Sequence, residues 1–109
     1  MNLPHLAPIL FAKHIKSKSD KSAIVLCEFP YPPTLPMLLE AAAQSSSALS
    51  EQEVKEAFLV SANSLKLYKK ATQLNYSIEV TQELKIKEMS IFSFSIKDLA
   101  DGKFTIYAK

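Results

Sequence analysis

The chain has 109 residues, 48% of them hydrophobic and 22% charged, and its net charge is +2. This length and composition predict one folded domain over residues 1–109, and so small a net charge gives no support for nucleic-acid binding. The only glycine, Gly102, excludes glycine-rich phosphate loops, and the only cysteine, Cys27, excludes an internal disulfide. No apolar run is long enough to span a membrane and no signal-peptide pattern opens the chain, so we expect a cytoplasmic protein.

Two strands are predicted near the start of the chain, over residues 9–16 and 22–29. Both segments are rich in apolar and β-branched residues, and the polar segment at residues 17–20 between them predicts a turn. Residues 2–8 are expected to form a turn as well, because Pro4 and Pro8 disfavour helix at the residue before each of them.

A proline-rich turn then leads into the one predicted helix, over residues 35–49 with its end near Ser50. Thr34 is a favourable N-cap residue, and Pro36 falls in the first turn, where a missing N–H costs least. Small or apolar residues point in nearly every direction around this helix, which predicts burial on most sides. Glu40 is its only carboxylate.

The remaining chain is predicted to be β-structure, with strands over residues 56–68, 75–89 and 90–98. The strand over residues 75–89 alternates apolar residues at Tyr76, Ile78, Val80, Leu84 and Ile86. Phe92 and Phe94 are expected to face the helix, and Asp101-Gly102 predicts a hairpin turn before a closing strand. These elements predict an α+β fold in which an antiparallel sheet wraps around one central helix.

Three segments carry a resemblance to a known family: "LPHLAPILFAKHI", "EFPYPPTLPMLLEAAAQSSS" and "FLVSANSLKLYKKATQLNYSIEV". The first resembles the Pro-His-x-x-Pro opening of FabA/FabZ-type β-hydroxyacyl-carrier-protein dehydratases. The second resembles their His-Phe-Pro, Met-Pro-Gly and Glu-Ala-x-Ala-Gln core, and the third a later strand, corner and strand. The chain is therefore similar to this family over nearly its whole length, especially its shorter dehydratase-like branch, and the resemblance implies the hot-dog fold.

The resemblance also implies a chemistry on 3-hydroxyacyl thioesters. Family members remove the α proton and protonate the departing hydroxyl with one histidine and one acid. Glu40 matches the family acid, and Gln44 matches the glutamine one turn later. The backbone N–H groups of Met37 and Leu38, at the positive end of the helix dipole, match the groups that hold the thioester carbonyl.

Further contacts with the substrate or its carrier are expected around this segment. Pro36 and Phe29 are expected to contact the bound substrate. A basic corner is expected to bind the phosphate of a pantetheine arm or an acidic carrier protein. The alternative is that this corner is only a solvated part of the surface. This corner consists of Lys66, Lys69 and Lys70.

Two positions depart from the family pattern. Glu28 stands where the family has its catalytic histidine, and Met37 stands where it has a glycine. Carboxyl and imidazole groups have reference pKa values near 4.3 and 6.5, so Glu28 does not simply inherit the histidine's role. Glu28 and Glu40 could still form an acid–base pair of carboxyl groups. The alternatives are a surface residue at a strand end for Glu28 and a surface or interface carboxylate for Glu40.

The remaining reactive side chains are given structural roles. His5 matches the family's N-terminal turn, His14 lies in the first predicted strand, and Cys27 is expected to be a packed core thiol. Two histidines without acidic or thiol partners at ligand spacing predict no metal site. Gln44 has a structural hydrogen bond as its alternative role.

The sequence-based hypothesis is a dimer of hot-dog subunits that handles acyl thioesters carried on acyl-carrier protein or coenzyme A, as in fatty-acid biosynthesis, with no cofactor of its own. A homodimer, or a dimer of dimers, would pair the open sheet edge and complete the site. If the protein is an enzyme, dehydration by Glu40 with Glu28 is the leading reaction. Thioester hydrolysis by a Glu40-activated water and non-catalytic acyl binding or assembly are the alternatives.

Overall fold

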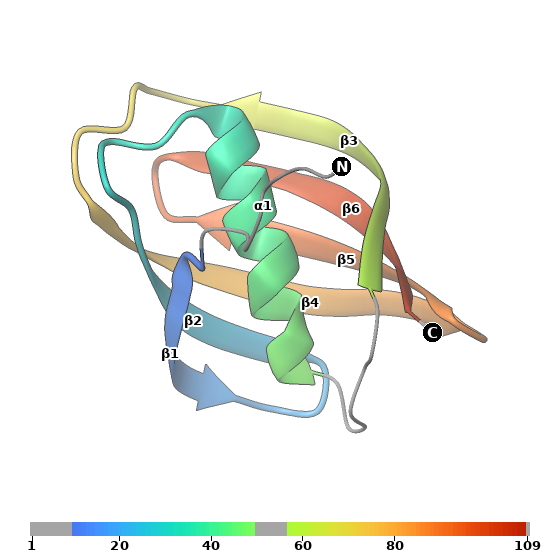
Figure 1. Cartoon of the computed structure of the whole chain (residues 1–109). Coiled ribbons are helices and arrows are strands. Elements are labelled where there is room, and N and C mark those ends of the chain that lie inside the picture. Colours follow the sequence, from blue (N-terminus) through green and yellow to red (C-terminus); the bar gives the residue numbers. More distant parts are fainter. Residues whose placement is uncertain (1–9, 50–56, 109) are drawn as a thin grey trace, which may run out of the picture.

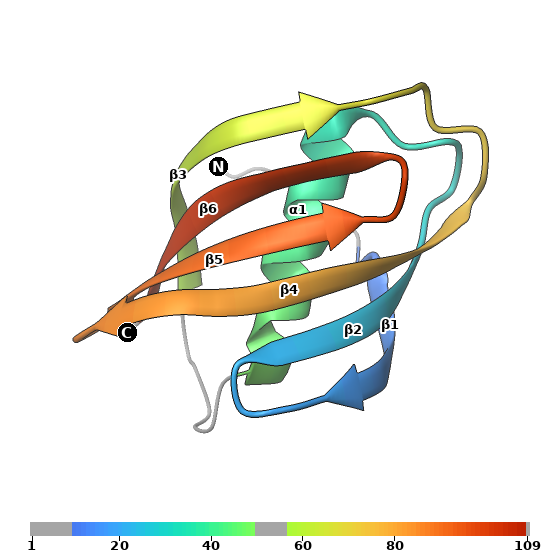
Figure 2. The same ribbon diagram turned by 180° about the vertical axis from the view of Figure 1, so that it is seen from behind.

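The computed structural model describes residues 10–49 and 57–108. One α-helix lies against a strongly curved, six-stranded antiparallel sheet whose strand order is β1-β2-β4-β5-β6-β3 (Figures 1 and 2). The elements are β1 (Ala12–Lys18), β2 (Ser22–Glu28), α1 (Leu35–Ser45), the 3-10 helix η1 (Ser46–Leu49), β3 (Ala57–Leu67), β4 (Asn75–Ile86), β5 (Met89–Ile96) and β6 (Ala100–Ala108). The predicted α+β class, an antiparallel sheet around a single helix, is confirmed.

Helix α1 begins where the sequence predicted. The Thr34 hydroxyl accepts a hydrogen bond from the Met37 N–H at 3.5 Å, and Pro36 lies in the first turn. Regular α-helix stops at Ser45, earlier than predicted, and continues as the 3-10 turn of η1; Ser50 lies outside the described residues. The buried residues recur with helical spacing, so one continuous stripe faces the sheet. They are Leu38, Ala41, Ala42 and Ser45.

The core lies between this stripe and the concave face of the sheet. Phe104 is 1% exposed and stacks on Phe92 with ring centroids 5.4 Å apart. Phe94 lies 6.0 Å from the same ring and is also buried. The prediction that Phe92 and Phe94 belong to the core beneath the helix is therefore confirmed.

The prediction of one uniform alternation over residues 75–89 is wrong. The β4–β5 register pairs Gln82 with Phe92 but then Leu84 with Ile91, so β4 carries one extra residue in a β-bulge. One extra residue turns the side chains that follow it to the other face of the sheet. Leu84 and Ile86 consequently lie on the outer face, away from α1, and are 48% and 60% exposed.

The prediction of a hairpin turn at Asp101-Gly102 is also wrong. The turn lies at residues 97–99, where Asp98 has a positive φ of 59°, and both Asp101 and Gly102 belong to β6. Gly102 is closely packed there, because a Cβ on it would lie 2.5 Å from Leu65 Cδ2 and 3.0 Å from Phe94 Cε1.

Strand ends elsewhere differ slightly from the predictions. The first strand runs from Ala12 to Lys18, and Ile9, where it was expected to begin, lies outside the described residues. Glu56, the expected first residue of the next strand after the helix, lies outside them as well. The predicted strand over residues 75–89 ends at Ile86, and a turn at Lys87 and Glu88 leads into β5.

Candidate functional site

Glu28 and Glu40 both have exposed side chains. In the sequence, Glu28 precedes the proline-rich turn and Glu40 follows it. Glu28 is the last residue of β2, where its backbone N–H donates to the carbonyl of Phe11 at 2.9 Å. Glu40 lies in the middle of α1, on the face opposite the buried stripe. Positions 28 and 40 are thus set by β2 and α1, the two regular elements that the proline-rich turn connects.

Gln44 links the helix to the first strand. Its side-chain Oε1 accepts hydrogen bonds from the backbone N–H groups of Phe11 at 2.7 Å and Ala12 at 3.1 Å. Its Nε2 donates to Glu40 Oε2 at 3.4 Å. The Gln44 amide therefore holds the start of β1 and contacts the Glu40 carboxylate one turn earlier in the helix.

The two N–H groups expected to hold a thioester carbonyl have partners within the helix cap. The Leu38 N–H donates to the Thr34 carbonyl at 3.0 Å, which is the first hydrogen bond of the helix. The Met37 N–H donates to the Thr34 hydroxyl at 3.5 Å, at the long limit for such a bond. Met37 is thus the more weakly engaged donor of the two, while the Pro36 side chain is exposed beside them.

Phe29 is a core residue under the proline-rich turn. It is 4% exposed, and its ring lies 4.9 Å from that of Phe11 and 6.4 Å from that of Tyr76. Its backbone N–H donates to the Leu74 carbonyl at 2.7 Å, which joins the end of β2 to the start of β4. Phe29 therefore supports the turn from inside the protein, in an aromatic cluster that the sequence alone did not identify.

The predicted basic corner is exposed and well anchored. Lys66 lies at the end of β3, and Lys69 and Lys70 follow it in the loop. Between them, the Tyr68 hydroxyl donates to Asp101 Oδ2 at 2.6 Å. This hydrogen bond, with smaller contributions from burial and from the Asp101 charge, raises the pKa of Tyr68 above its usual value.

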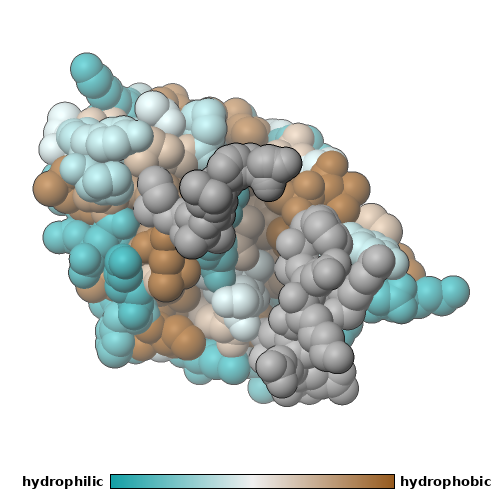
Figure 3. Space-filling view, in the orientation of Figure 1, coloured by the Kyte–Doolittle hydropathy of each residue, from teal (hydrophilic) through white to brown (hydrophobic). Residues whose placement is uncertain are grey.

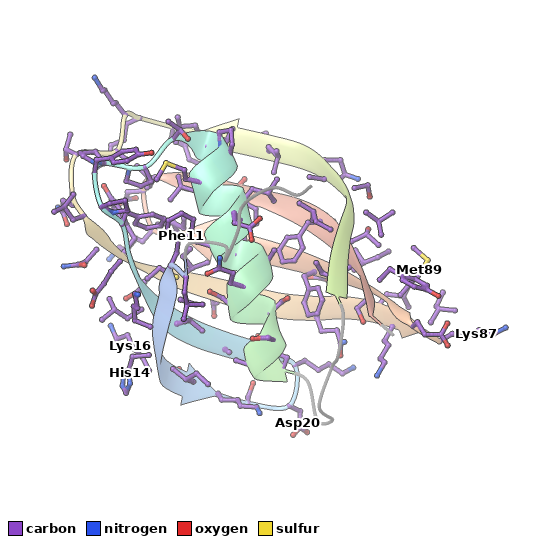
Figure 4. The ribbon with its side chains drawn as sticks, viewed as in Figure 1. Phe11, His14, Lys16, Asp20, Lys87 and Met89 are labelled. Atoms are coloured by element: carbon purple, nitrogen blue, oxygen red, sulfur yellow. The ribbon has the colours of Figure 1, made fainter. Side chains whose placement is uncertain are left out.

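Among the described residues, neither His14 nor Cys27 has its side chain beside Glu40. His14 lies on β1 with an exposed side chain that points away from the sheet (Figure 4), and His5 lies outside the described residues. Cys27 is fully buried, with its Sγ 3.5 Å from Ser45 Oγ, and burial raises the pKa of the thiol. Cys27 is therefore a packed core thiol.

Within the described part of the chain, no three side chains among His, Cys, Asp and Glu are grouped closely enough to hold a metal ion. No helix there is both long and apolar enough to cross a membrane.

Two grooves, of about 300 and 350 Å³, lie on the outer face and end of the sheet. They share Ser95 and Asp101, and neither is lined by Glu28 or Glu40. The groove of about 300 Å³ is lined mainly by alternate polar residues of β4, β5 and β6, which the period of two in these strands predicts for an outer face. On the helix side, hydrophobic surface forms separate patches between hydrophilic areas (Figure 3).

Comparison with solved structures decides the fold. The "Dehydratase Heterocomplex ApeI:P" from Xenorhabdus doucetiae matches with a TM-score of 0.74 at 17% identity, covering 98% of this chain and 88% of that one. The smu.793 protein from Streptococcus mutans, bound to acetyl CoA, has a TM-score of 0.67 at 13% identity and covers 97% of both chains. A hypothetical thioesterase from Streptococcus pneumoniae with coenzyme A has a TM-score of 0.66 at 9% identity, covering 88% of this chain and 84% of that one.

The chain has the hot-dog fold. At these identities the similarity is one of architecture. No protein-family model matches the sequence, and no curated protein matches it.

Proposed function

We propose that this hot-dog protein binds acyl thioesters and acts as a dehydratase-type subunit, with Glu40 as its acid–base group. The observation that carries the proposal is the contact between Gln44 Nε2 and Glu40 Oε2, in a helix whose N-terminus is fixed behind a rigid turn. Gln44 also accepts two backbone hydrogen bonds at the start of β1, so the amide that contacts Glu40 is held in place. The exposure of Glu40 leaves the carboxylate accessible to a ligand.

The proposed reaction removes water from a 3-hydroxyacyl thioester. A carboxylate takes the α proton, the bond between the β carbon and its hydroxyl breaks, and a protonated group gives its proton to the hydroxyl as it leaves as water. Glu40 fills one of these roles, and Glu28 is the candidate for the other. The Met37 N–H, at the positive end of the helix dipole, would stabilise the charge that builds on the thioester carbonyl.

Pairing through β3 would complete the subunit assembly. β3 is the last strand of the described sheet and has a neighbour, β6, on one side. Residues 57–65 carry no charge, whereas β1 at the opposite edge carries Lys13, Lys16 and Lys18. Charged edges resist strand pairing, so β3 is the edge suited to a second copy of this chain. Lys66 would lie near that junction and, with Lys69 and Lys70, could receive a pantetheine phosphate or an acidic carrier protein.

The test is hydration of an enoyl thioester, the reverse reaction, followed by loss of the conjugated absorbance. The wild-type chain should convert crotonyl thioesters of coenzyme A or acyl-carrier protein, and Glu40→Gln should lower the rate by a factor of about 100 or more. Glu79→Gln is a matched control, because Glu79 is an exposed carboxylate on the outer face of β4. Unchanged hydration in Glu40→Gln would refute the assignment.

The same assay separates the two alternatives. A hydrolase would release free thiol from the thioester without changing the double bond. A non-catalytic acyl-binding or assembly subunit would do neither but would still bind a non-hydrolysable acyl thioester. The second alternative is favoured by one observation: His14 points away from the sheet, so this histidine does not lie beside the helix.

A further inference from the structure

The first hairpin of the sheet carries a concentration of positive charge that the rest of the chain lacks. Residues 12–22, which include β1 and the turn into β2, contain four lysines and one carboxylate, a net charge of +3. The whole chain has 13 basic and 11 acidic residues, so the residues outside this segment have a net charge of −1. We call the four lysines of the hairpin the basic edge: Lys13, Lys16, Lys18 and Lys21.

The charges of the basic edge are exposed and free to meet a partner. All four lysine side chains are exposed, and within the described sheet β1 has a neighbouring strand, β2, on one side only. Lys16 Nζ donates to the neutral hydroxyl of Ser77 at 3.1 Å. None of the four lysines forms an ion pair with a described carboxylate. Their positive charge is therefore not neutralised within the part of the chain that the structure describes.

The path of β1 spreads these lysines along one edge of the sheet. The register between β1 and β2 shifts twice, and Lys13 and Lys16 fall at the two shifts, so neither has a direct partner on β2. Figure 4 shows Lys16 projecting outward from β1. The long, flexible stem of lysine lets side chains from both faces of an edge strand reach a plane laid against that edge. One flat surface can therefore contact the whole basic edge.

Exposed apolar side chains lie among the lysines. Ile15 lies on β1 and is 47% exposed, and Leu10, just before this strand, is 59% exposed. At the boundary between lipid headgroups and acyl chains, ammonium groups meet phosphates while apolar side chains leave water. A mixture of lysines and apolar side chains on one edge is suited to this boundary.

The kind of cation favours a lipid surface over a nucleic acid or an acidic strand. All 13 basic residues of the chain are lysines. Nucleic-acid sites use arginine for bidentate contacts with bases and exposed aromatic residues for stacking, and residues 12–22 contain neither. A lysine ammonium is a point charge that needs no fixed geometry, which suits a layer of lipid phosphates. The two register shifts also disfavour an added acidic strand, because they interrupt the regular hydrogen-bonding edge.

We infer that the basic edge rests on a membrane surface that is rich in anionic phospholipid, with β1 against the headgroups. Peripheral contact of this kind needs no spanning helix. β1 and β3 lie at opposite ends of the strand order, so pairing of two copies through β3 leaves the basic edge open. The contact does not depend on Glu40 or on binding of an acyl thioester.

The experiment is co-sedimentation of the full chain with vesicles of phosphatidylcholine, either alone or mixed with an equal amount of phosphatidylglycerol. The wild type should bind the anionic vesicles and not the neutral ones, and added salt should weaken this binding because salt screens the charges. One lysine near an anionic membrane contributes about fivefold in affinity. The triple variant Lys13→Gln, Lys16→Gln, Lys18→Gln should therefore bind about 100-fold more weakly.

Two further variants control for net charge and for folding. The triple variant Lys85→Gln, Lys97→Gln, Lys103→Gln removes the same charge from exposed lysines outside the first hairpin and should bind like the wild type. Replacing the three lysines of β1 with arginine keeps the charge and should keep the binding. Circular dichroism would confirm that each variant is folded.

Several results would overturn the inference. One is a wild type that binds neither kind of vesicle, or binds both equally. Another is unchanged binding when the lysines of β1 become glutamine, or an equal loss in the control triple variant. A wild type that binds duplex DNA or a polyglutamate peptide in place of anionic vesicles would assign the basic edge to a nucleic acid or an acidic protein, and would also overturn it.

Discussion

Replacing Gln44 with leucine tests the link between helix α1 and strand β1. The side-chain Oε1 of Gln44 accepts two backbone hydrogen bonds, from Phe11 at 2.7 Å and from Ala12 at 3.1 Å. Leucine has a similar size but no acceptor, so both N–H groups would lose this partner. A backbone donor left without a partner when buried costs about 1–3 kcal/mol.

This site is only partly buried, and water can replace some of the lost bonding. We therefore expect Gln44→Leu to lower the free energy of unfolding by about 1–3 kcal/mol in total, rather than by that amount for each donor. For a domain of this size, each kcal/mol corresponds to a decrease in Tm of about 4–8 °C. Urea denaturation would measure the free energy, and hydrogen exchange would measure protection of the Phe11 and Ala12 amides.

Ser47→Ala is the matched control for this prediction. The Ser47 side chain is exposed and its hydroxyl donates to the Gln44 carbonyl at 2.8 Å, so its loss should change stability by about 0.5 kcal/mol or less. The reasoning would be refuted if Gln44→Leu were as stable as Ser47→Ala and both amides kept their protection. In folded Gln44→Leu, any turnover that depends on Glu40 should also fall, because the amide contact with its carboxylate is gone.

Two further predictions concern β6. Gly102→Ala should lower the free energy of unfolding by about 1–3 kcal/mol, because the new Cβ would lie 2.5 Å from Leu65 Cδ2 and 3.0 Å from Phe94 Cε1. Denaturant titration measures this change. A variant as stable as the wild type would contradict the prediction and would show that Leu65 moves aside freely. Asp101→Asn should lower the pKa of Tyr68 towards its usual value, because the hydrogen bond to Asp101 raises it. The raised pKa means that this contact stabilises the fold at pH values below the usual tyrosine pKa and is lost as pH rises through the raised one. A titration of tyrosinate absorbance, with Tyr68→Phe to identify the signal, should therefore show earlier ionisation in Asp101→Asn, and an unmoved titration would contradict the assignment.

Several features could be predicted because neighbouring residues alone determine them. Thr34 and Pro36 fix the start of α1 through capping and the missing proline N–H, and the structure begins the helix there. Alternation brings Phe92 and Phe94 to the same face of β5, and both are buried. The order of these local elements was enough to predict an antiparallel sheet around one helix, and the resemblance to a known family implied the hot-dog fold.

Other features depend on contacts between residues distant in the sequence. The β4 bulge arises from its pairing with β5, so the period of two alone placed Leu84 and Ile86 on the wrong face. The turn predicted at Asp101-Gly102 fails for the same reason, because Gly102 packs against Leu65 on a neighbouring strand.

The candidate site divides in the same way. The sequence identified Glu40 and Gln44 by their positions in a resembling segment, and helical spacing of four residues places them within contact. It could not show that Gln44 also holds Phe11, just before β1, and Ala12, its first residue, which lie 33 and 32 positions earlier in the chain. The sequence by itself therefore determined where the helix begins and where Glu40 lies in it. Only the tertiary structure decided which strand and which hydrogen bonds lie next to the Glu40 carboxylate. Strand register and long-range hydrogen bonds depend on which distant segments of the chain meet.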